Sequence, residues 1–274
     1  MNRRSFVQAA SLPLFAPALA ALRWPPEPLR RIGLQLYTVR DLMRTDVART
    51  LEQVAAAGYA EVEFAGYFGV PPARLRAMLD ATGLRAPSSH LSLEDITQNP
   101  NRVFDSAEAL GHRYLVVPSL DDRDRRTLDD YRRVADRLNR SGALAQARGL
   151  QIGYHNHDFE LRPIGGVRPY DLLLTETDPA LVRFEMDFYW MTRGGADPLS
   201  YFTRYPGRFH LCHLKDMDRR GAMADVGSGR IDFRKILQSR ETAGLRHFYV
   251  EHDQPPDPLA SIRASCRFLR SLEL

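Results

Sequence analysis

Four metal-competent side chains each stand at the end of a short apolar run, where a buried strand would give way to a loop. They are His155, Asp187, His213 and Glu251. Two imidazoles and two carboxylates form a mixed nitrogen and oxygen set that suits Mn²⁺, Co²⁺, Zn²⁺ or Mg²⁺. Each residue alone has a commoner explanation, because strand-end histidines are usually hydrogen-bonded and Asp187 could cap the next helix. Their occurrence at four consecutive run ends predicts one divalent metal site.

Further polar and aromatic side chains follow the same or neighbouring runs. We expect the substrate to be bound by His90, His157, Lys215, Tyr37 and Trp190. Lys215 is one of two lysines in a chain with 36 arginines, which weakly indicates that a compact ammonium is needed in the pocket. Packing in the core explains Tyr37 and Trp190 equally well.

An internal repeat indicates how these residues are positioned. Five helix-like segments end in a glycine that is followed, within about three residues, by a strand-like run. A glycine just past a helix end adopts the left-handed conformation, and a short loop then returns the chain to a parallel sheet. The glycines are Gly58, Gly83, Gly111, Gly149 and Gly244. The strand-like runs are 31–37, 61–64, 85–90, 114–117, 151–155, 182–187, 208–214 and 247–250.

Eight strands that alternate with helices predict an α/β fold, a (β/α)8 TIM barrel in a single domain. The structural competitor is an open doubly wound sheet, but it normally has a glycine-rich first turn that is missing after 31–37. In a barrel the site lies at the carboxyl ends of the strands. If His213 points inward, alternation places Phe209, Leu211 and Lys215 inside, and His210 against the helices.

The first residues predict an export signal. Arg3 and Arg4 form a twin-arginine pair before the apolar stretch 9–19, and small residues near Ala20 suit a signal peptidase. We therefore expect a Tat signal peptide over 1–21, a proline-rich lead-in over 22–30 and the barrel over 31–274. The mature protein would then be periplasmic, with no membrane association beyond the signal.

Charge and cysteine content limit the partners. Removal of residues 1–20 leaves 36 basic and 34 acidic residues, and the basic residues form no stripe, so we expect no nucleic-acid partner. Cys212 and Cys266 lie in apolar segments, and we expect two buried free thiols although a disulfide is possible in an exported protein. A homo-oligomer is possible.

Over residues 32–272 the chain resembles the xylose isomerase-like TIM-barrel superfamily, and more narrowly its sugar phosphate isomerase/epimerase branch. The resemblance is carried by six motifs along the chain. They are GLQLYT at 33–38, YHNHDFE at 154–160, FEMDFYW at 184–190, HLKDM at 213–217, VGSGRIDF at 226–233 and Val250-Glu251.

This resemblance implies one divalent metal held by Glu, Asp, His and Glu from four strands. The last three positions fall on Asp187, His213 and Glu251, whereas the first falls on His155, where many relatives have Glu. In ketose epimerases of this group two glutamates exchange protons with opposite faces of the substrate. Only Glu251 remains here, so His155 or Glu160 would have to return the proton.

Four functions remain open. The favoured hypothesis is a sugar isomerase or epimerase that abstracts a proton next to a carbonyl through a metal-stabilised enediolate. A lyase could use the same site, for inosose-type dehydration or β-elimination of a 3-keto-glycoside. Export to the periplasm favours the second reaction, because glycosides are accessible there. The third is a non-catalytic sugar-binding barrel. The fourth, an abasic-site endonuclease, expects a basic DNA track, which the chain lacks. In the first three, the partner is a small sugar or polyol.

Overall fold

The computed structural model describes residue 29 and residues 31–274. The predicted signal peptide at 1–21 and nearly all of the predicted lead-in at 22–30 lie outside the described residues. Among the residues described, no helix is both long and apolar enough to cross a membrane.

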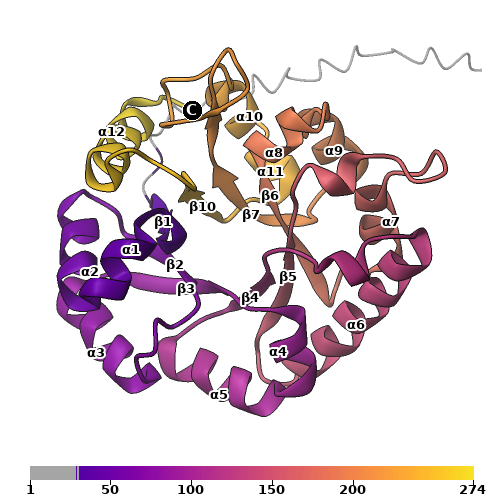
Figure 1. Ribbon diagram of the computed structural model, residues 1–274, viewed down its shortest axis with the longest axis horizontal. Helices are drawn as coiled ribbons and strands as arrows, with labels where there is room; N and C mark the ends of the chain where they lie inside the picture. The colour runs from indigo at the N-terminus through magenta and orange to yellow at the C-terminus, as the bar shows by residue number, and fades with distance from the viewer. Residues whose placement is uncertain (1–28, 30) are drawn as a thin grey trace, which may run out of the picture.

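Eight parallel strands close into a barrel that helices surround on the outside (Figure 1). The strands are β1 (Gly33–Gln35), β2 (Glu61–Ala65), β3 (Arg85–His90), β4 (Tyr114–Val117), β5 (Gln151–His155), β6 (Val182–Asp187), β7 (Phe209–Leu214) and β10 (His247–Val250). Their order around the barrel is β1-β10-β7-β6-β5-β4-β3-β2, so each strand pairs with its neighbour in the chain and β10 closes on β1. The predicted (β/α)8 fold is confirmed.

The helical layer is richer than one helix per strand. The α-helices are α1 (Arg40–Thr45), α2 (Val47–Ala56), α3 (Pro72–Thr82), α4 (Leu93–Gln98), α5 (Pro100–Leu110), α6 (Leu128–Gln146), α7 (Pro169–Glu176), α8 (Phe188–Arg193), α9 (Pro198–Arg204), α10 (Phe233–Leu237), α11 (Arg240–Ala243) and α12 (Pro258–Ser271). Short 3-10 turns are η1 (Leu36–Val39), η2 (Asp122–Asp124) and η3 (Phe159–Leu161). A small antiparallel pair, β8 (Asp216–Met217) and β9 (Met223–Ala224), follows β7.

The predicted helix ends are confirmed. All five repeat glycines have positive φ, between 70° at Gly83 and 103° at Gly58. A side chain would strain the backbone in this left-handed conformation, which explains why glycine occupies these five positions.

Two strand predictions are wrong in detail. The run predicted at 31–37 is a strand only as far as Gln35, because the next residues form η1 and the Gln35 side chain caps it by accepting from the Tyr37 N–H.

In β7 the pairing with β6 skips His210, which leaves one extra residue in a β-bulge. Below that bulge the alternation is reversed, so Phe209 packs on Phe202 among the helices. His210 instead contacts the hydroxyl of Tyr114 in the barrel interior, 3.1 Å from Nδ1.

Apolar packing is divided between two layers. A large core fills the space between strands and helices and includes both free cysteines, Cys212 and Cys266, as predicted. A much smaller cluster fills the barrel itself and consists of Tyr114, Val116, Leu211 and Tyr249. Toward the carboxyl ends of the strands the interior becomes polar, and the chemistry lies there.

Candidate functional site

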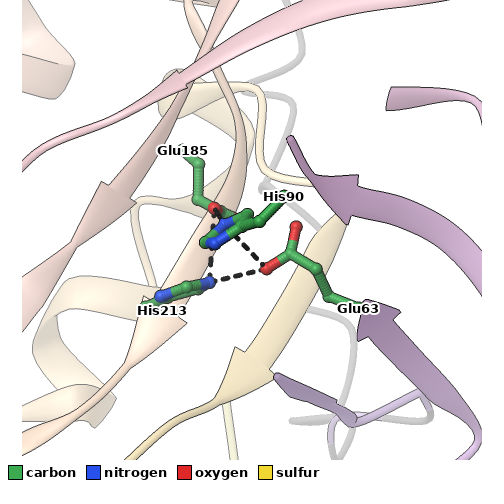
Figure 2. Close-up of side chains that lie close together, drawn as sticks. All are labelled: Glu63, His90, Glu185 and His213. Carbon is green, nitrogen blue, oxygen red and sulfur yellow. Dashed lines mark hydrogen bonds and ion pairs between the residues drawn. The ribbon is translucent and has the colours of Figure 1, made fainter. Parts of the chain in front are cut away.

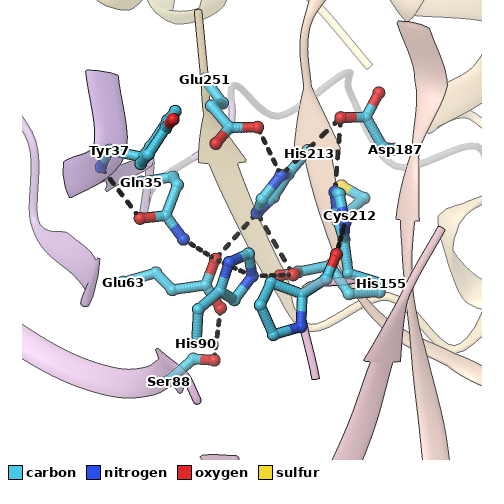
Figure 3. A network of polar contacts seen from close by, with 12 residues as sticks. Gln35, Tyr37, Glu63, Ser88, His90, His155, Asp187, Cys212, His213 and Glu251 are labelled. Carbon is cyan, nitrogen blue, oxygen red and sulfur yellow. Dashed lines mark hydrogen bonds and ion pairs between the residues drawn. The ribbon is translucent and has the colours of Figure 1, made fainter. Parts of the chain in front are cut away.

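The four predicted metal ligands converge at the carboxyl ends of four adjacent strands. His155 ends β5, Asp187 ends β6, His213 lies near the end of β7 and Glu251 follows β10. One nitrogen or oxygen atom from each lies within 4.8 Å of those of the other three, and all four side chains are buried. Figure 3 shows these side chains directed toward one another.

The protonation of His155 provides a test of whether these residues fit a metal. Its Nδ1 lies 3.0 Å from the Pro118 carbonyl, so Nδ1 carries the proton and donates it there. Its Nε2 therefore presents a lone pair, and this atom lies 3.4 Å from Asp187 Oδ2. Both atoms are buried, and among the described residues neither makes a hydrogen bond. In the neutral imidazole the Nε2 lone pair faces Asp187 Oδ2 across a gap that a cation fits, and the ammonium of Lys215 lies 3.1 Å from that oxygen on another side.

His213 lies between two groups of carboxylates. Its Nδ1 is 2.9 Å from Glu251 Oε2, and its Nε2 is 2.8 Å from Glu63 Oε2 and 3.2 Å from Glu185 Oε2. Burial lowers the pKa of His213, but Glu185 and Glu251 outweigh it and raise that pKa well above its usual value. A metal at Nδ1 must therefore displace a proton that the protein holds tightly.

Lys215 is buried against three carboxylates. Its Nζ lies 3.1 Å from Asp187 Oδ2, 2.5 Å from Glu251 Oε2 and 2.8 Å from Asp253 Oδ1. Burial raises the pKa of Glu251, but Lys215 and His213 reverse this and hold it well below its usual value. The Glu251 side chain is therefore ionised at neutral pH and able to accept a proton.

A second polar cluster lies deeper in the barrel, and the sequence analysis missed it. It joins Glu63, His90 and Glu185 to the inner face of His213 (Figure 2). Burial lowers the pKa of His90, but Glu63 and Glu185 outweigh it and raise the pKa to about 9. The available signal was an acidic residue inside an apolar strand: Glu185 stands two residues before Asp187 and so shares its face.

These residues open onto a cavity of about 210 Å³. Its size lies below the range of about 300–1,000 Å³ usual for drug-sized ligands and suits a small polyol. Four of the predicted substrate-binding residues line it, together with two ligands and three residues that were not predicted. They are Tyr37, His90, His157 and Lys215, the ligands His155 and Glu251, and Pro118, Ser119 and Asp253.

Trp190 supports the cavity wall from behind. Its ring lies 5.0 Å from that of His157, centroid to centroid, and Lys215 Nζ lies 5.5 Å from the Trp190 ring centroid. Burial and the neighbouring His155 and Lys215 lower the pKa of His157 to about 2, so its imidazole is neutral. His157 can therefore hydrogen-bond a substrate hydroxyl but is a very weak base.

Glu160, predicted to return a proton, does not line the cavity. Its carboxylate accepts hydrogen bonds from the Tyr154 hydroxyl at 2.7 Å and from the His157 backbone N–H at 2.9 Å. The side chain is completely buried, and burial raises its pKa to about 7. Glu160 therefore stabilises the loop that carries His157. This position corrects the prediction that Glu160 returns a proton to the substrate.

The loop after β7 is held in place by Asp216. This buried carboxylate accepts hydrogen bonds from the backbone N–H groups of Gly227 and Gly229, both at 2.9 Å, and of Ile231 at 3.1 Å. A Cβ added at Gly229 would lie 2.3 Å from Asp216 Oδ1. These hydrogen bonds fix the segment 227–231 against Asp216.

Comparison with known proteins agrees with this geometry. The model of the xylose isomerase-like TIM barrel family matches residues 51–272. The chain belongs to that family. It is 27% identical over 248 residues to an inosose dehydratase of Lacticaseibacillus casei, covering 76% of this chain and 82% of that protein.

Solved structures share the fold of this family member. A sugar phosphate isomerase/epimerase from Parabacteroides distasonis is 27% identical and superposes with a TM-score of 0.77, over 93% of this chain and 96% of that one. A 3-keto-D-glucoside 4-epimerase from E. coli is 18% identical, covers 88% and 99% of the two chains, and has a TM-score of 0.68. The relatives are thus dehydratases as well as isomerases and epimerases.

Proposed function

We propose that this protein is a metal-dependent lyase that eliminates water or an alcohol β to the carbonyl of a keto-polyol or keto-sugar. The observation that carries the proposal is the contrast between its proton-transfer groups. One ionised carboxylate, Glu251, and one cationic imidazole, His90, line the cavity, whereas neither residue predicted as a second base is available. The other carboxylate on the cavity wall, Asp253, is paired with Lys215 at 2.8 Å.

Both ring nitrogens of His155 are engaged. Nδ1 donates to Pro118, and Nε2 faces Asp187 in the metal site. Glu160, the other candidate, faces the Tyr154 hydroxyl outside the cavity. An epimerase of the two-base kind needs a second group that takes or returns a proton on the opposite face of the substrate. Elimination needs only one base and one acid.

The residues present fit a single divalent metal, held by His155, Asp187, His213 and Glu251. When bound, such an ion supplies Lewis acidity toward a carbonyl and its neighbouring hydroxyl. The protein supplies the proton transfers. Lys215 keeps Glu251 ionised, and the buried position of these groups excludes bulk water from them.

In the proposed reaction Glu251 takes the proton from the carbon next to the carbonyl. The electron pair of that C–H bond becomes part of the new C=C bond, and the C–O bond to the β substituent breaks with its electrons. The departing oxygen takes a proton from His90, whose imidazolium keeps a proton on each ring nitrogen. The products are an α,β-unsaturated ketone and water or an alcohol, with no change in overall oxidation state.

Isomerisation or epimerisation is the second candidate. Proton abstraction by Glu251 followed by return of the proton from the same carboxyl group would give it, and the neutral imidazole of His157 on the cavity wall would hydrogen-bond the substrate. The inosose dehydratases among the relatives support the lyase, and the solved isomerase/epimerase supports this alternative.

The test is incubation of the Mn²⁺-loaded protein with 2-keto-myo-inositol and with methyl 3-keto-glucoside in D₂O, followed by NMR. An enone, with release of methanol from the glycoside, supports the lyase. Deuterium incorporation without an enone favours the isomerase. Binding without either reaction overturns both and leaves the non-catalytic barrel. Glu251→Gln is the control and should abolish proton exchange.

We also propose that the protein is exported, supported by the twin-arginine pair and the apolar stretch after it. Replacement of Arg3 and Arg4 by lysine should leave the protein in the cytoplasmic fraction. Recovery of this variant in the periplasm would remove the export proposal without touching the chemistry.

A further inference from the structure

We propose that Glu63 and Glu185 hold the Nε2 proton of the His213 ring and so direct its Nδ1 lone pair at the metal. They are positioning residues, since they act through His213. The inference rests on the metal site of the proposed function, and it assigns a role to buried carboxylates that neither the motifs nor the chemistry above explain.

The geometry is a closed ring of four atoms (Figure 2). His213 Nε2 lies 2.8 Å from Glu63 Oε2 and 3.2 Å from Glu185 Oε2. His90 Nε2 faces the same two oxygens, at 2.7 Å from Glu185 and 3.2 Å from Glu63. Each Nε2 atom therefore has one contact of hydrogen-bond length and one longer contact. One proton on the Nε2 of each imidazole accounts for this pattern.

This cluster of two histidines and two carboxylates has the composition of a second metal site, but both oxygens of Glu63 already accept hydrogen bonds. Glu63 Oε2 accepts from the Gln35 amide at 2.7 Å as well as from His213, and Glu63 Oε1 accepts from the Ser88 hydroxyl. Figure 3 shows these contacts around Glu63. A metal would have to displace hydrogen bonds that the fold builds for this carboxylate. Glu63 is therefore placed to accept hydrogen bonds, including the one from His213 Nε2, rather than to bind a metal.

The location of the proton on His213 decides whether a metal can bind. A metal binds only the neutral imidazole, which carries one proton, and on His213 two sets of acceptors compete for that proton. Glu251 Oε2 lies 2.9 Å from Nδ1, while Glu63 and Glu185 lie at Nε2. A proton on Nδ1 would occupy the position that the metal needs. Asp187 Oδ2 lies farther from Nδ1, at 3.8 Å. The two inner carboxylates, at 2.8 and 3.2 Å, hold the proton on Nε2, as partners behind metal-bound histidines commonly do.

The experiment measures Zn²⁺ binding to the full chain, using a chromophoric chelator as competitor and mass spectrometry for stoichiometry. Glu63→Gln and Glu185→Gln are compared with Glu61→Gln. Glu61 is a matched control because it is also buried on β2 and pairs with a histidine, His247 Nδ1 at 2.8 Å, away from the proposed ligands.

We expect one Zn²⁺ per wild-type chain, a loss of about 10- to 100-fold in affinity for the two test variants, and an unchanged affinity for Glu61→Gln. Unchanged affinity in both test variants would overturn the inference while leaving the proposed function intact. Two Zn²⁺ per chain, with one lost in Glu63→Gln, would overturn it in favour of a second metal site. A wild-type chain that binds no Zn²⁺ would remove the proposed function together with this inference.

A spectroscopic readout separates positioning from simple structural damage. In wild-type protein loaded with Zn²⁺, the ¹⁵N chemical shifts of the His213 ring should report a protonated Nε2 and a metal-bound Nδ1. The opposite assignment overturns the inference, and this measurement needs no variant to fold. In Glu185→Gln loaded with Zn²⁺ we expect a changed ¹⁵N chemical shift of the His213 Nε2, with circular dichroism showing an intact fold.

Discussion

His155 Nε2 and Asp187 Oδ2 lie 3.4 Å apart in the buried interior of the barrel, and His155 donates a proton to the Pro118 carbonyl from its other ring nitrogen, Nδ1. A divalent cation between the Nε2 lone pair and the carboxylate would be attracted to both, so such a metal should stabilise the folded chain. A metal present at 100 times its dissociation constant adds about 2.7 kcal/mol to the free energy of unfolding. Thermal unfolding with Mn²⁺, Zn²⁺ or EDTA measures the effect, and we expect EDTA to lower the melting temperature.

Asp187→Asn and Asp197→Asn form the matched pair for this prediction. Both aspartates cap a helix by accepting a backbone N–H, from Trp190 and from Leu199 respectively. Only Asp187 lies in the metal site, so the metal-dependent rise in melting temperature should vanish in Asp187→Asn and persist in Asp197→Asn. An equal rise in both variants would place the metal elsewhere.

The two lysines of the chain allow a clean comparison of buried and surface charge. Lys215 faces three carboxylates, whereas Lys235 lies exposed on α10. Lys215→Met leaves those carboxylates without their cation, and loss of one partner of a buried ion pair typically costs about 3–5 kcal/mol of stability. Lys235→Met should change stability by less than about 0.5 kcal/mol. Urea unfolding of the metal-free proteins measures both, and similar values would contradict the buried network.

Patterns local in the sequence predicted the barrel and the four side chains that converge at the carboxyl ends of its strands. A glycine that closes a helix and a polar residue that ends a strand each depend on a few neighbouring residues. Glu63 was missed because its partner His213 is 150 residues away in the chain, and pairing across a barrel has no local signal. Glu185 did carry a local signal, its position two residues before Asp187 in an apolar strand, and that signal was not used.

The errors have equally specific causes. The Phe209 and His210 assignments failed because a β-bulge reverses the side-chain alternation that the prediction assumed. Glu160 stands in a polar run beside two ligands in the sequence, but η3 turns its side chain toward Tyr154 and away from the cavity. Proximity in sequence to a ligand does not determine which face of a turn a residue occupies.

The loop after β7 should depend on a single carboxylate. Asp216→Ala removes the buried acceptor for the backbone N–H groups of Gly227, Gly229 and Ile231. A hydrogen bond to a charged group contributes about 1.5–3 kcal/mol, so we expect faster limited proteolysis within 217–231 and a lower melting temperature. Asp218→Ala is the control, since Asp218 also accepts backbone N–H groups but lies at the exposed tip of the β8–β9 turn. Equal cleavage of both variants would argue against Asp216 as the anchor.

Glu160 should give the stability of the protein a pH dependence that has nothing to do with the metal. Burial raises its pKa from 4.5 to about 7. Between these values the unfolded chain releases the proton while the folded chain keeps it, so Glu160 lowers stability as the pH rises, and the effect levels off above about pH 7. The pKa difference corresponds to at most about 3 kcal/mol.

Glu160→Gln removes this ionisation and should flatten the fall in the free energy of unfolding between pH 4.5 and 7. Urea unfolding at half-unit pH steps measures it, with Glu52→Gln as the control because Glu52 is exposed on α2. At low pH, where Glu160 is protonated in both states, the Gln variant should be less stable than wild type, since an amide nitrogen cannot accept both hydrogen bonds that the carboxyl receives from Tyr154 and His157. As the pH rises toward 7 the two stabilities should converge, and parallel curves would show that Glu160 titrates normally in the folded protein.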